Sequence, residues 1–130
     1  MVLPRFVNSA INNDPISIYG DGTQSRVFCH VSDAVRAILT IAETDSTIGE
    51  VYNVGGVGEV SIKQLADRII DRTKSSSVIT YTPYDAAYPV GYEDMQRRVP
   101  DISKIRSAIG WEPEKTLDNI IDDVAAEMKK

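Results

Sequence analysis

The sequence predicts an α/β fold in one domain spanning residues 1–130. Stretches with helical hydrophobic spacing alternate along the chain with short β-prone runs, which is typical of the α/β class. A length of 130 residues fits a single domain. With 42% apolar and 25% charged residues, the composition is that of an ordinary globular protein.

The N-terminal part predicts a helix followed by two strands. Pro4 suits the first position of a helix over residues 4–12, because its missing N–H has no partner there anyway. Residues 16–19 form a β-prone run. The glycines of 20–22 supply the positive φ that a tight turn needs, and residues 26–31 predict the second strand.

A second helix is expected to begin at Ser32 or Asp33, either of which can cap it, and to run to Ala42. Its apolar stripe is expected to face the core. The stripe consists of Val35, Ile38, Leu39 and Ala42.

The middle of the chain predicts a strand over residues 51–54 and a glycine-rich turn over 55–58. Ser61 and Gln64 have the spacing of a capping box, which opens a helix with a regular apolar face. Residues 78–82 predict another strand.

The C-terminal part begins with an irregular segment, residues 83–100, that is rich in proline and tyrosine. Such a long loop is expected to be functional or disordered. Asp101 can cap a helix over 102–109, which Gly110 closes as a C-terminal glycine. A last helix is expected over residues 117–128.

The bulk properties exclude several classes of function. A net charge of −5 and a pI of about 4.8 argue against broad nucleic-acid binding. No apolar run approaches the length of a membrane span, and no secretory signal is visible at the N-terminus. The single Cys29 fits a reducing, cytoplasmic setting and cannot build a zinc cluster.

Residues 56–61 are close to the dinucleotide-binding pattern G-x-G-x-x-G between a strand and a helix. Ser61 replaces the third glycine and has a use as a helix cap. No second strand ends in an acidic residue about 20 positions later, where a ribose contact would require one. The pattern therefore favours a flexible turn over a cofactor loop.

Arginines beside the Gly-rich and Pro-rich segments are the best anion-binding candidates in this acidic chain. Arg26 and Arg97–Arg98 can form paired bonds to phosphate oxygens. The alternative is a set of solvated ion pairs with Glu93, Asp94 or Asp101, and spacing alone favours it, because most surface charges contribute little.

His30 lacks a metal-binding or nucleophilic partner at a motif position, so we expect a structural histidine, and Cys29 is expected to be a small core residue. Four tyrosines either line a ligand-facing loop or cover the core with their hydroxyls in solvent. They are Tyr81, Tyr84, Tyr88 and Tyr92.

Five short motifs follow one another along the chain. They are Leu3–Val7, Pro15–Arg26, His30–Asp33, Val51–Gly55, and Arg97–Lys104 with Ile109–Pro113. In this order and spacing they resemble the C-terminal half of the extended short-chain dehydrogenase/reductase family of NAD-dependent nucleotide-sugar enzymes. The nearest branches are UDP-glucuronate decarboxylases, UDP-sugar 4-epimerases and dTDP-glucose dehydratases.

The resemblance implies a substrate site. Backbone groups of Ser17, Ile18 and Tyr19 would lie along the pyrimidine base, and Arg26 and Arg98 would contact the diphosphate of a UDP- or dTDP-sugar. Arg97 is the weaker candidate. The glycines at 55, 56 and 58 would be structural.

The resemblance also implies which parts of the family's chemistry lie outside these residues. The family binds NAD on an N-terminal Rossmann domain with a Gly-rich loop and uses a Tyr-x-x-x-Lys pair, and neither occurs in these 130 residues. We therefore expect a small mixed α/β substrate-binding lobe without the Rossmann domain, without bound NAD and inactive alone. It would be a homo-oligomer or interaction module that associates through uncovered apolar surface, or one subunit of a split enzyme with a separate NAD-binding lobe.

Overall fold

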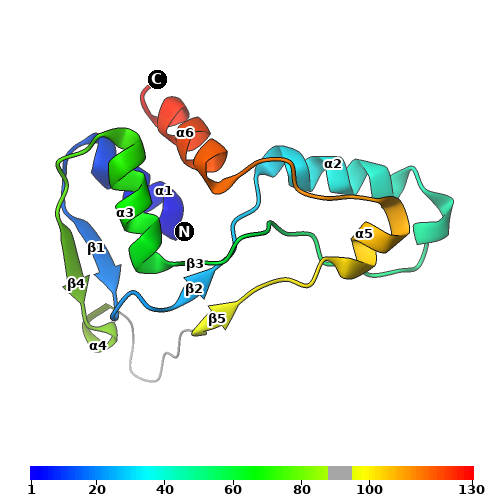
Figure 1. The fold of residues 1–130 in the computed structure, drawn as a ribbon, viewed down its shortest axis with the longest axis horizontal. Coiled ribbons are helices and arrows are strands. Elements are labelled where there is room, and N and C mark those ends of the chain that lie inside the picture. Colours follow the sequence, from blue (N-terminus) through cyan, green and yellow to red (C-terminus); the bar gives the residue numbers. More distant parts are fainter. Residues whose placement is uncertain (88–94) are drawn as a thin grey trace. The chain divides into compact units, whose positions relative to one another are not determined.

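The computed structural model describes residues 1–87 and 95–130. Their contacts divide the chain into two compact units, which are described separately (Figure 1). Unit 1 contains Met1–Arg26, Val60–Arg98 and Ile121–Lys130, and unit 2 contains Val27–Glu59 and Val99–Ile120. The mixture of helices and strands agrees with the predicted α/β class.

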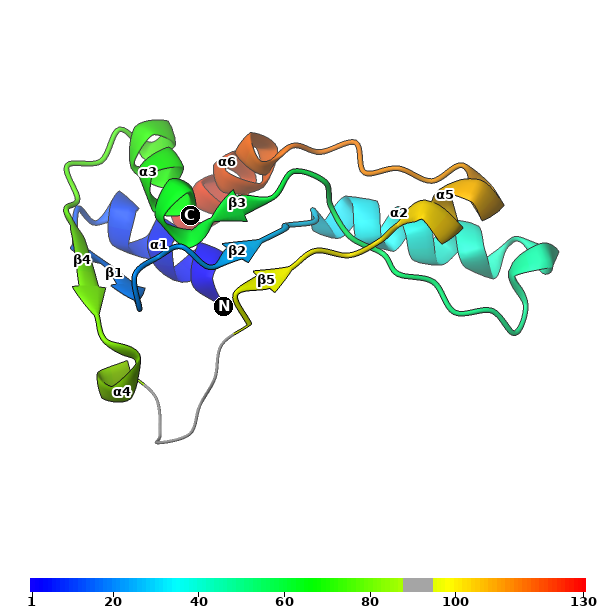
Figure 2. The same ribbon diagram turned by 60° about the horizontal axis from the view of Figure 1, so that its bottom comes forward.

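Two small sheets form the strand part of unit 1. In one, β1 (Ile16–Tyr19) pairs in parallel with β4 (Ile79–Thr82). In the other, β2 (Ser25–Arg26) lies between β3 (Val60–Ser61) and β5 (Arg97–Arg98), antiparallel to the first and parallel to the second (Figure 2). The chain thus reaches β2 from β1 through the predicted glycine turn.

The helices α1 (Val2–Ile11) and α3 (Ile62–Thr73) pack against each other and supply much of the core of unit 1. The second half of α6 (Leu117–Met128) joins them, and Arg72 of α3 pairs there with Asp122. The fully buried large side chains of unit 1 are Phe6, Val7, Ile16, Ile18, Leu65, Ile69 and Ile121.

The predicted capping box opens α3. Ser61 accepts a hydrogen bond from the backbone N–H of Gln64, and the Gln64 side chain accepts one from the N–H of Ser61. The turn before β2 is also as predicted, because Gly20 and Gly22 have φ values of +74° and +77°. A side chain on Gly20 would in addition collide with the ring of Tyr84, in the short helix α4 (Tyr84–Ala87).

Unit 2 is built on α2 (Val31–Ala42) and α5 (Ser103–Ile109), with a short 3-10 turn, η1 (Asp45–Thr47), between them in sequence. Gly110 ends α5 with a φ of +66°, as predicted. The buried apolar cluster consists of Ala37, Ile102, Ile105 and Trp111, and the half-buried Cys29 packs against it, in agreement with its expected core role.

The N-terminus of α2 differs from the prediction. His30 is its N-cap, and its ring Nδ1 accepts a hydrogen bond of 3.1 Å from the backbone N–H of Ser32. His30 therefore has the structural role expected of it, while the cap expected at Ser32 or Asp33 is wrong. Asp33 lies inside the first turn of the helix rather than at the cap position, and its side chain is buried, with only 2% of its surface exposed.

Asp33 fastens α2 to the segment that follows α5. Its Oδ2 accepts the backbone N–H of Lys115 at 3.0 Å, its Oδ1 accepts from Arg36 at 2.9 Å, and its backbone carbonyl accepts the indole N–H of Trp111 at 3.2 Å. Burial raises the pKa of Asp33, but the amides of Lys115 and Glu114 and the Arg36 guanidinium together outweigh burial. The pKa of Asp33 consequently lies below its ordinary value.

The predicted core stripe of α2 is the main error in the expected fold. Within the described parts of unit 2, the buried residues of α2 are Asp33 and Ala37, and the apolar stripe is exposed. The exposed members are Val35, Ile38, Leu39 and Ala42. The helix was predicted correctly, but its periodicity does not tell which face the rest of the chain covers.

The boundaries of several other predicted elements also differ from those in the structure. The expected strand over 26–31 shrinks to β2, and residues 51–54 do not form a strand. The expected loop 83–100 contains α4 and β5. Tyr88 and Tyr92 were expected either to line a ligand-facing loop or to cover the core, and Glu93 and Asp94 were expected as ion-pair partners. All four lie outside the described residues. In the described part of the chain, no helix is long and apolar enough to cross a membrane.

The Asp33 carboxylate should make the stability of unit 2 depend on pH. Replacing Asp33 by Asn removes the charge from its hydrogen bonds, which should lower the free energy of unfolding at pH 7 by about 2 kcal/mol. A lowered folded pKa means that this contribution is complete above the unfolded value of 3.8 and disappears as pH falls through the folded value. Urea titrations followed by Trp111 fluorescence should therefore show that the free energies of unfolding of wild type and Asp33→Asn converge below about pH 4.

The exposed Glu43 at the end of α2 provides the control. Its replacement by Gln should change stability by less than about 0.5 kcal/mol at pH 7. A constant gap between wild type and Asp33→Asn from about pH 7 to about pH 2.5 would contradict the role given to the charge.

Candidate functional site

The predicted phosphate-binding arginines are neighbours on adjacent strands. Arg26 of β2 and Arg98 of β5 are directly paired in the parallel register, as are Ser25 and Arg97. Paired residues on neighbouring strands point to the same side of the sheet, with their backbones about 4.8 Å apart. Arg26 and Arg98 therefore share one side of the sheet, while Arg97 lies on the other.

Local hydrogen bonds fix the position of Arg26. Its Nη1 donates to the backbone carbonyls of Ser25 and Met95, both at 2.7 Å. The backbone N–H of Ser25 donates to the carbonyl of Gln96 at 2.8 Å. Arg26, a half-buried residue, is thereby tied to Met95, two residues before β5 begins.

The backbone groups of the three predicted base-contacting residues, Ser17, Ile18 and Tyr19, face in two different directions. Ile16 and Gly20 donate their backbone N–H groups to β4 and its flank, at Val78 and Thr82. Backbone groups alternate in direction along a strand, so those of Ile18 also face β4, and its side chain is buried.

The backbone groups of Ser17 and Tyr19 consequently face the outer edge of this sheet, away from β4. The Ser17 side chain is engaged across the sheet, where its Oγ lies 2.8 Å from Oγ1 of Thr82. Of the three residues, Ser17 and Tyr19 can thus present backbone groups along the edge of β1.

Two residues that the sequence did not single out as site residues lie at this edge. The Arg5 guanidinium donates to the carbonyl of Ser17 at 3.0 Å and lies 4.1 Å from the centroid of the Tyr19 ring. The Gln24 side-chain amide donates to the carbonyl of Tyr19 at 2.9 Å. The sequence signals were slight: Arg5 lies on the side of the helix away from its apolar face, and Gln24 lies inside a turn motif.

Gln24 is also the most constrained polar residue of the site. Only 4% of its surface is exposed, and its Oε1 is buried without a hydrogen-bond partner among the described residues. Its backbone carbonyl accepts the N–H of Ile62 at 3.0 Å, at the start of α3. Gln24 therefore links β1, β2 and α3 through both its backbone and its side chain.

The glycine-rich stretch that resembles a dinucleotide loop is explained by packing. A side chain on Gly56 would overlap the backbone carbonyl of Phe28, and one on Gly55 would overlap Pro100. Gly58 has a φ of +86° and open space around it. The N-terminus of the following helix is already capped by Ser61. These contacts favour the structural interpretation of the stretch.

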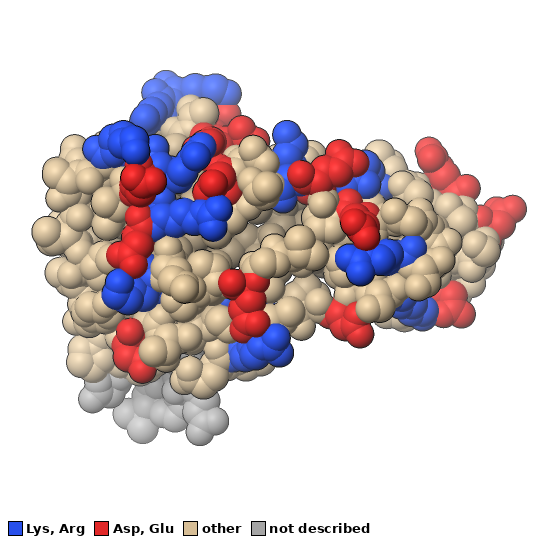
Figure 3. Space-filling view, in the orientation of Figure 1, with Lys and Arg blue, Asp and Glu red and all other residues tan. Residues whose placement is uncertain are grey.

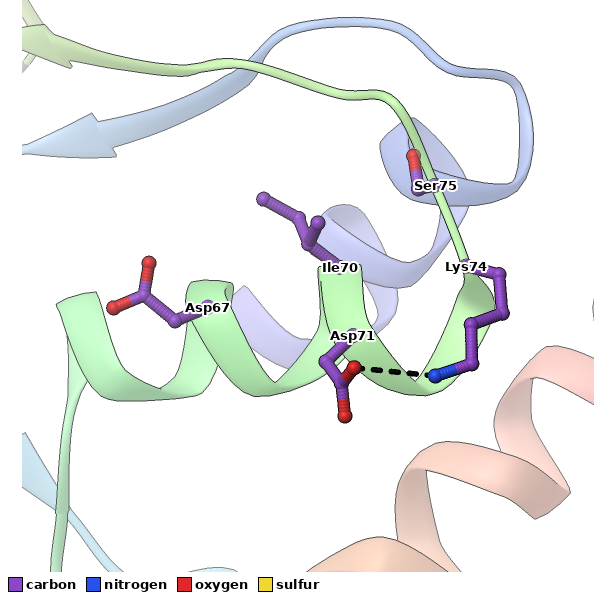
Figure 4. Close-up of a pocket in the computed structure, with 5 residues that line it drawn as sticks. All are labelled: Asp67, Ile70, Asp71, Lys74 and Ser75. Carbon is purple, nitrogen blue, oxygen red and sulfur yellow. Dashed lines mark hydrogen bonds and ion pairs between the residues drawn. The ribbon is translucent and has the colours of Figure 1, made fainter.

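A shallow cavity on the surface of α3 lies apart from these residues. It is lined by Asp67, Ile70, Asp71, Lys74 and Ser75 (Figure 4). The ammonium of Lys74 is paired with Asp71 at 3.2 Å. The cavity is therefore lined by two carboxylates and by one cation whose charge is already neutralised. This chemistry does not suit an anionic ligand.

The distribution of charge on the face drawn in Figure 3 indicates no competing site. On the face drawn in Figure 3, basic and acidic side chains are intermingled rather than gathered by sign. Within residues 1–87 and 95–130, no three His, Cys, Asp or Glu side chains are grouped to hold a metal ion. The paired arginines and the β1 edge therefore remain the best-supported site in the described structure.

Comparison with known proteins gives consistent matches. A family model described as GDP-mannose 4,6 dehydratase matches residues 1–124. The UDP-N-acetyl-α-D-glucosaminuronate decarboxylase of Bacillus cytotoxicus is 42% identical over 113 residues, which cover 86% of this chain and 35% of that protein. The UDP-glucuronic acid decarboxylase 1 of Arabidopsis thaliana is 34% identical over 116 residues, covering 89% of this chain and 25% of that protein.

Solved structures agree with these relatives. An epimerase of Methanothermobacter thermautotrophicus matches with a TM-score of 0.86 at 26% identity, covering 99% of this chain and 37% of that one. The UDP-glucuronic acid 4-epimerase of Bacillus cereus, solved with UDP-glucuronic acid and NAD, matches with a TM-score of 0.82 at 25% identity, covering 98% and 40%. The chain thus spans between a quarter and two fifths of the length of these proteins.

Converting Gln24 to Glu should destabilise unit 1 in a pH-dependent way. The change places a carboxylate in a buried position against the Tyr19 carbonyl, which should lower the free energy of unfolding by about 3 kcal/mol or more at pH 7. Burial raises the folded pKa of such a carboxyl above the unfolded value of about 4.3, so stability returns below that value and is lost as pH rises. Circular dichroism during urea unfolding measures the effect.

Gln64→Glu is the matched control, because a capping box accepts Glu in place of Gln and the residue is exposed. Its stability should stay within about 0.5 kcal/mol of wild type. Equal stabilities of the two variants at pH 7 would contradict the buried position of Gln24.

Replacing Gly56 by Ala should destabilise unit 2 by more than about 2 kcal/mol, because the new methyl group overlaps backbone that cannot move independently. Gly58→Ala, in open space, should cost about 1 kcal/mol for its positive φ alone. Trp111 fluorescence during urea unfolding compares them. If the two substitutions proved equally mild, close packing would not explain Gly56.

Proposed function

This chain belongs to the GDP-mannose 4,6-dehydratase family, and on that premise we propose that it is the substrate-binding part of a nucleotide-sugar epimerase, dehydratase or decarboxylase. It binds the UDP or dTDP portion of the substrate. The family agrees with the one that the sequence motifs predicted. The ligand class is inferred from relatives named for UDP-sugars, two of which are UDP-glucuronic acid and UDP-N-acetyl-glucosaminuronate enzymes.

The pairing of Arg26 with Arg98 carries this proposal. Two cations directly opposite on neighbouring strands repel each other, and the rest of the chain is acidic. A diphosphate relieves that repulsion and accepts charge-assisted hydrogen bonds from both guanidinium groups. The hydrogen bonds of Arg26 to Ser25 and Met95 position one of these groups before the ligand arrives.

The outer edge of β1 suits the pyrimidine base. Ser17 and Tyr19 direct backbone groups to that edge, and the Arg5 and Gln24 side chains already bind their carbonyls. In this proposal the edge offers the base mainly N–H donors, which match the carbonyl oxygens of uracil or thymine. Arg5 and Gln24 act as positioning residues that keep the edge in place.

The proposal assigns binding alone to this chain. Packing against Phe28 and Pro100 accounts for its glycine-rich stretch, and we assign the chain no redox or acid–base step. Those steps belong to the parts of the family enzymes that lie outside the matched segment. Association with a second copy, or with a separate NAD-binding lobe, is proposed as the context in which the bound substrate reacts.

Titration with UDP, followed by calorimetry or NMR, tests the proposal. Wild type should bind UDP, and Arg26→Ala or Arg98→Ala should each weaken binding about tenfold or more, because each removes a charge-assisted hydrogen bond. Arg68→Ala is the matched control: it removes the same charge from an exposed position on α3 and should leave the affinity within about twofold. Lack of binding by wild type would refute the proposal.

UMP provides a sharper comparison. If Arg98 contacts the second phosphate, its replacement should weaken UDP binding strongly and leave UMP binding nearly unchanged. The difference between the losses of affinity for UDP and for UMP gives the coupling energy between the Arg98 side chain and the second phosphate, as in a double-mutant cycle. Equal losses for UDP and UMP would place Arg98 away from that phosphate.

A further inference from the structure

Arg5 is a cation at the edge of β1, in a position that the packing of its own helix does not require. The buried residues of α1 are Leu3, Phe6, Val7 and Ala10, and Arg5 lies on the other side of the helix. It is nevertheless half-buried, and its guanidinium reaches the backbone of β1. Arg5 therefore belongs to the candidate site rather than to the core of unit 1.

Two contacts hold the guanidinium of Arg5. Its Nη2 donates to the carbonyl of Ser17 at 3.0 Å, and its central carbon lies 4.1 Å from the centroid of the Tyr19 ring. A planar guanidinium stacks on an aromatic face, so its orientation is restricted as well as its position. Ser17 and Tyr19 are also the residues whose backbone groups face the outer edge of β1. A ligand lying along that edge would therefore meet a guanidinium that is already oriented.

The guanidinium of Arg5 can donate further hydrogen bonds. Within residues 1–87 and 95–130 it makes one hydrogen bond, to Ser17, and no ion pair. Arginine carries several N–H donors and no acceptor, so this contact leaves donors for a ligand. The carbonyls of Ser17 and Tyr19 already accept hydrogen bonds from Arg5 and Gln24. This end of the edge consequently favours a ligand group that accepts hydrogen bonds over one that donates them.

The pyrimidine bases differ in this respect at position 4 of the ring. Uracil and thymine carry a carbonyl oxygen there, which accepts hydrogen bonds, whereas cytosine carries an amino group, which donates them. The oxygen at position 2 is common to all three. Discrimination between these bases therefore depends on the protein group that faces position 4.

The direction of the chain indicates which group that is. From Tyr19 the chain continues through the glycine turn to β2 and Arg26, and Gln24 beside β2 binds the Tyr19 carbonyl. The Tyr19 end of β1 is thus nearer to the proposed diphosphate site than the Ser17 end. Position 4 of a pyrimidine lies opposite the ring nitrogen that bears the ribose and its diphosphate. It would therefore point toward the Ser17 end, where Arg5 donates.

We propose that Arg5 is a specificity-determining residue that donates a hydrogen bond to the position-4 carbonyl of uracil or thymine and selects against cytosine. With cytosine, the N–H groups of Arg5 would face an amino group, and donors on both sides would lose their acceptors. The inference rests on the proposed function, because it takes the base to lie along the edge of β1.

Titration with UDP and CDP tests the inference, because the two ligands carry the same diphosphate and differ in the base. Wild type should bind UDP about tenfold or more tightly than CDP. Arg5→Ala should weaken UDP binding about tenfold and CDP binding by less than about twofold, so that the preference for UDP disappears. Arg68→Ala, which removes the same charge from an exposed position on α3, is the matched control and should leave the preference unchanged.

Arg5→Gln separates recognition of the base from a purely structural role. The amide oxygen of glutamine can accept a hydrogen bond from the cytosine amino group, so this variant should bind CDP at least as tightly as UDP. A contact that only ties α1 to β1 would change the thermal unfolding midpoint and would weaken both nucleotides equally. Where Arg5→Ala does not fold, Arg5→Gln carries the test.

The outcomes distinguish this inference from the proposed function. If UDP binds but both Arg5 variants keep the wild-type ratio of UDP to CDP affinity within about twofold, the inference is overturned and the proposed function stands. Equal affinities of wild type for UDP and CDP would have the same meaning. If wild type binds no UDP, the proposed function itself is refuted, and this inference with it.

Discussion

The arrangement of the candidate site depends on a two-residue strand. Ser25 and Arg26 are the whole of β2, yet they pair with β3 on one side and β5 on the other. The same stretch reaches α3, because the carbonyls of Gly22 and Gln24 accept the N–H groups of Lys63 and Ile62 at 3.0 Å. Backbone pairing alone thus brings together segments that lie far apart in the sequence, and the side-by-side position of Arg26 and Arg98 follows from the register.

The register that pairs Arg26 with Arg98 is electrostatically unfavourable. A like-charged pair directly opposite on neighbouring strands is destabilising, and other residue types would satisfy the same backbone ladder. The chain places this pair in a protein of net charge −5, where cations have acidic groups available as partners elsewhere. The repulsion between the two arginines is what the proposed diphosphate ligand would offset.

Local signals in the sequence predicted what is locally determined. The Ser61–Gln64 capping box, the C-terminal Gly110 and the turn glycines each depend on a few neighbouring residues, and all are present in the structure. The roles of Arg5 and Gln24 could not be found in that way, because their partners are backbone carbonyls on another element. The motif series predicted the family, and the register then showed how Arg26 and Arg98 come together.

The wrong prediction for α2 has the same physical origin and is the most instructive. Periodicity shows that Val35, Ile38 and Leu39 form a stripe, and a stripe is normally taken to face the core. Here the inner side is held by Asp33, whose buried carboxylate is stabilised by an amide and a guanidinium. A buried carboxylate destabilises a fold unless such partners are supplied, so the Asp33 side cannot turn outward without losing them. The polar contacts of Asp33 therefore fix the orientation of the helix and leave its apolar side exposed, which is why the sequence pattern failed as a prediction of the core.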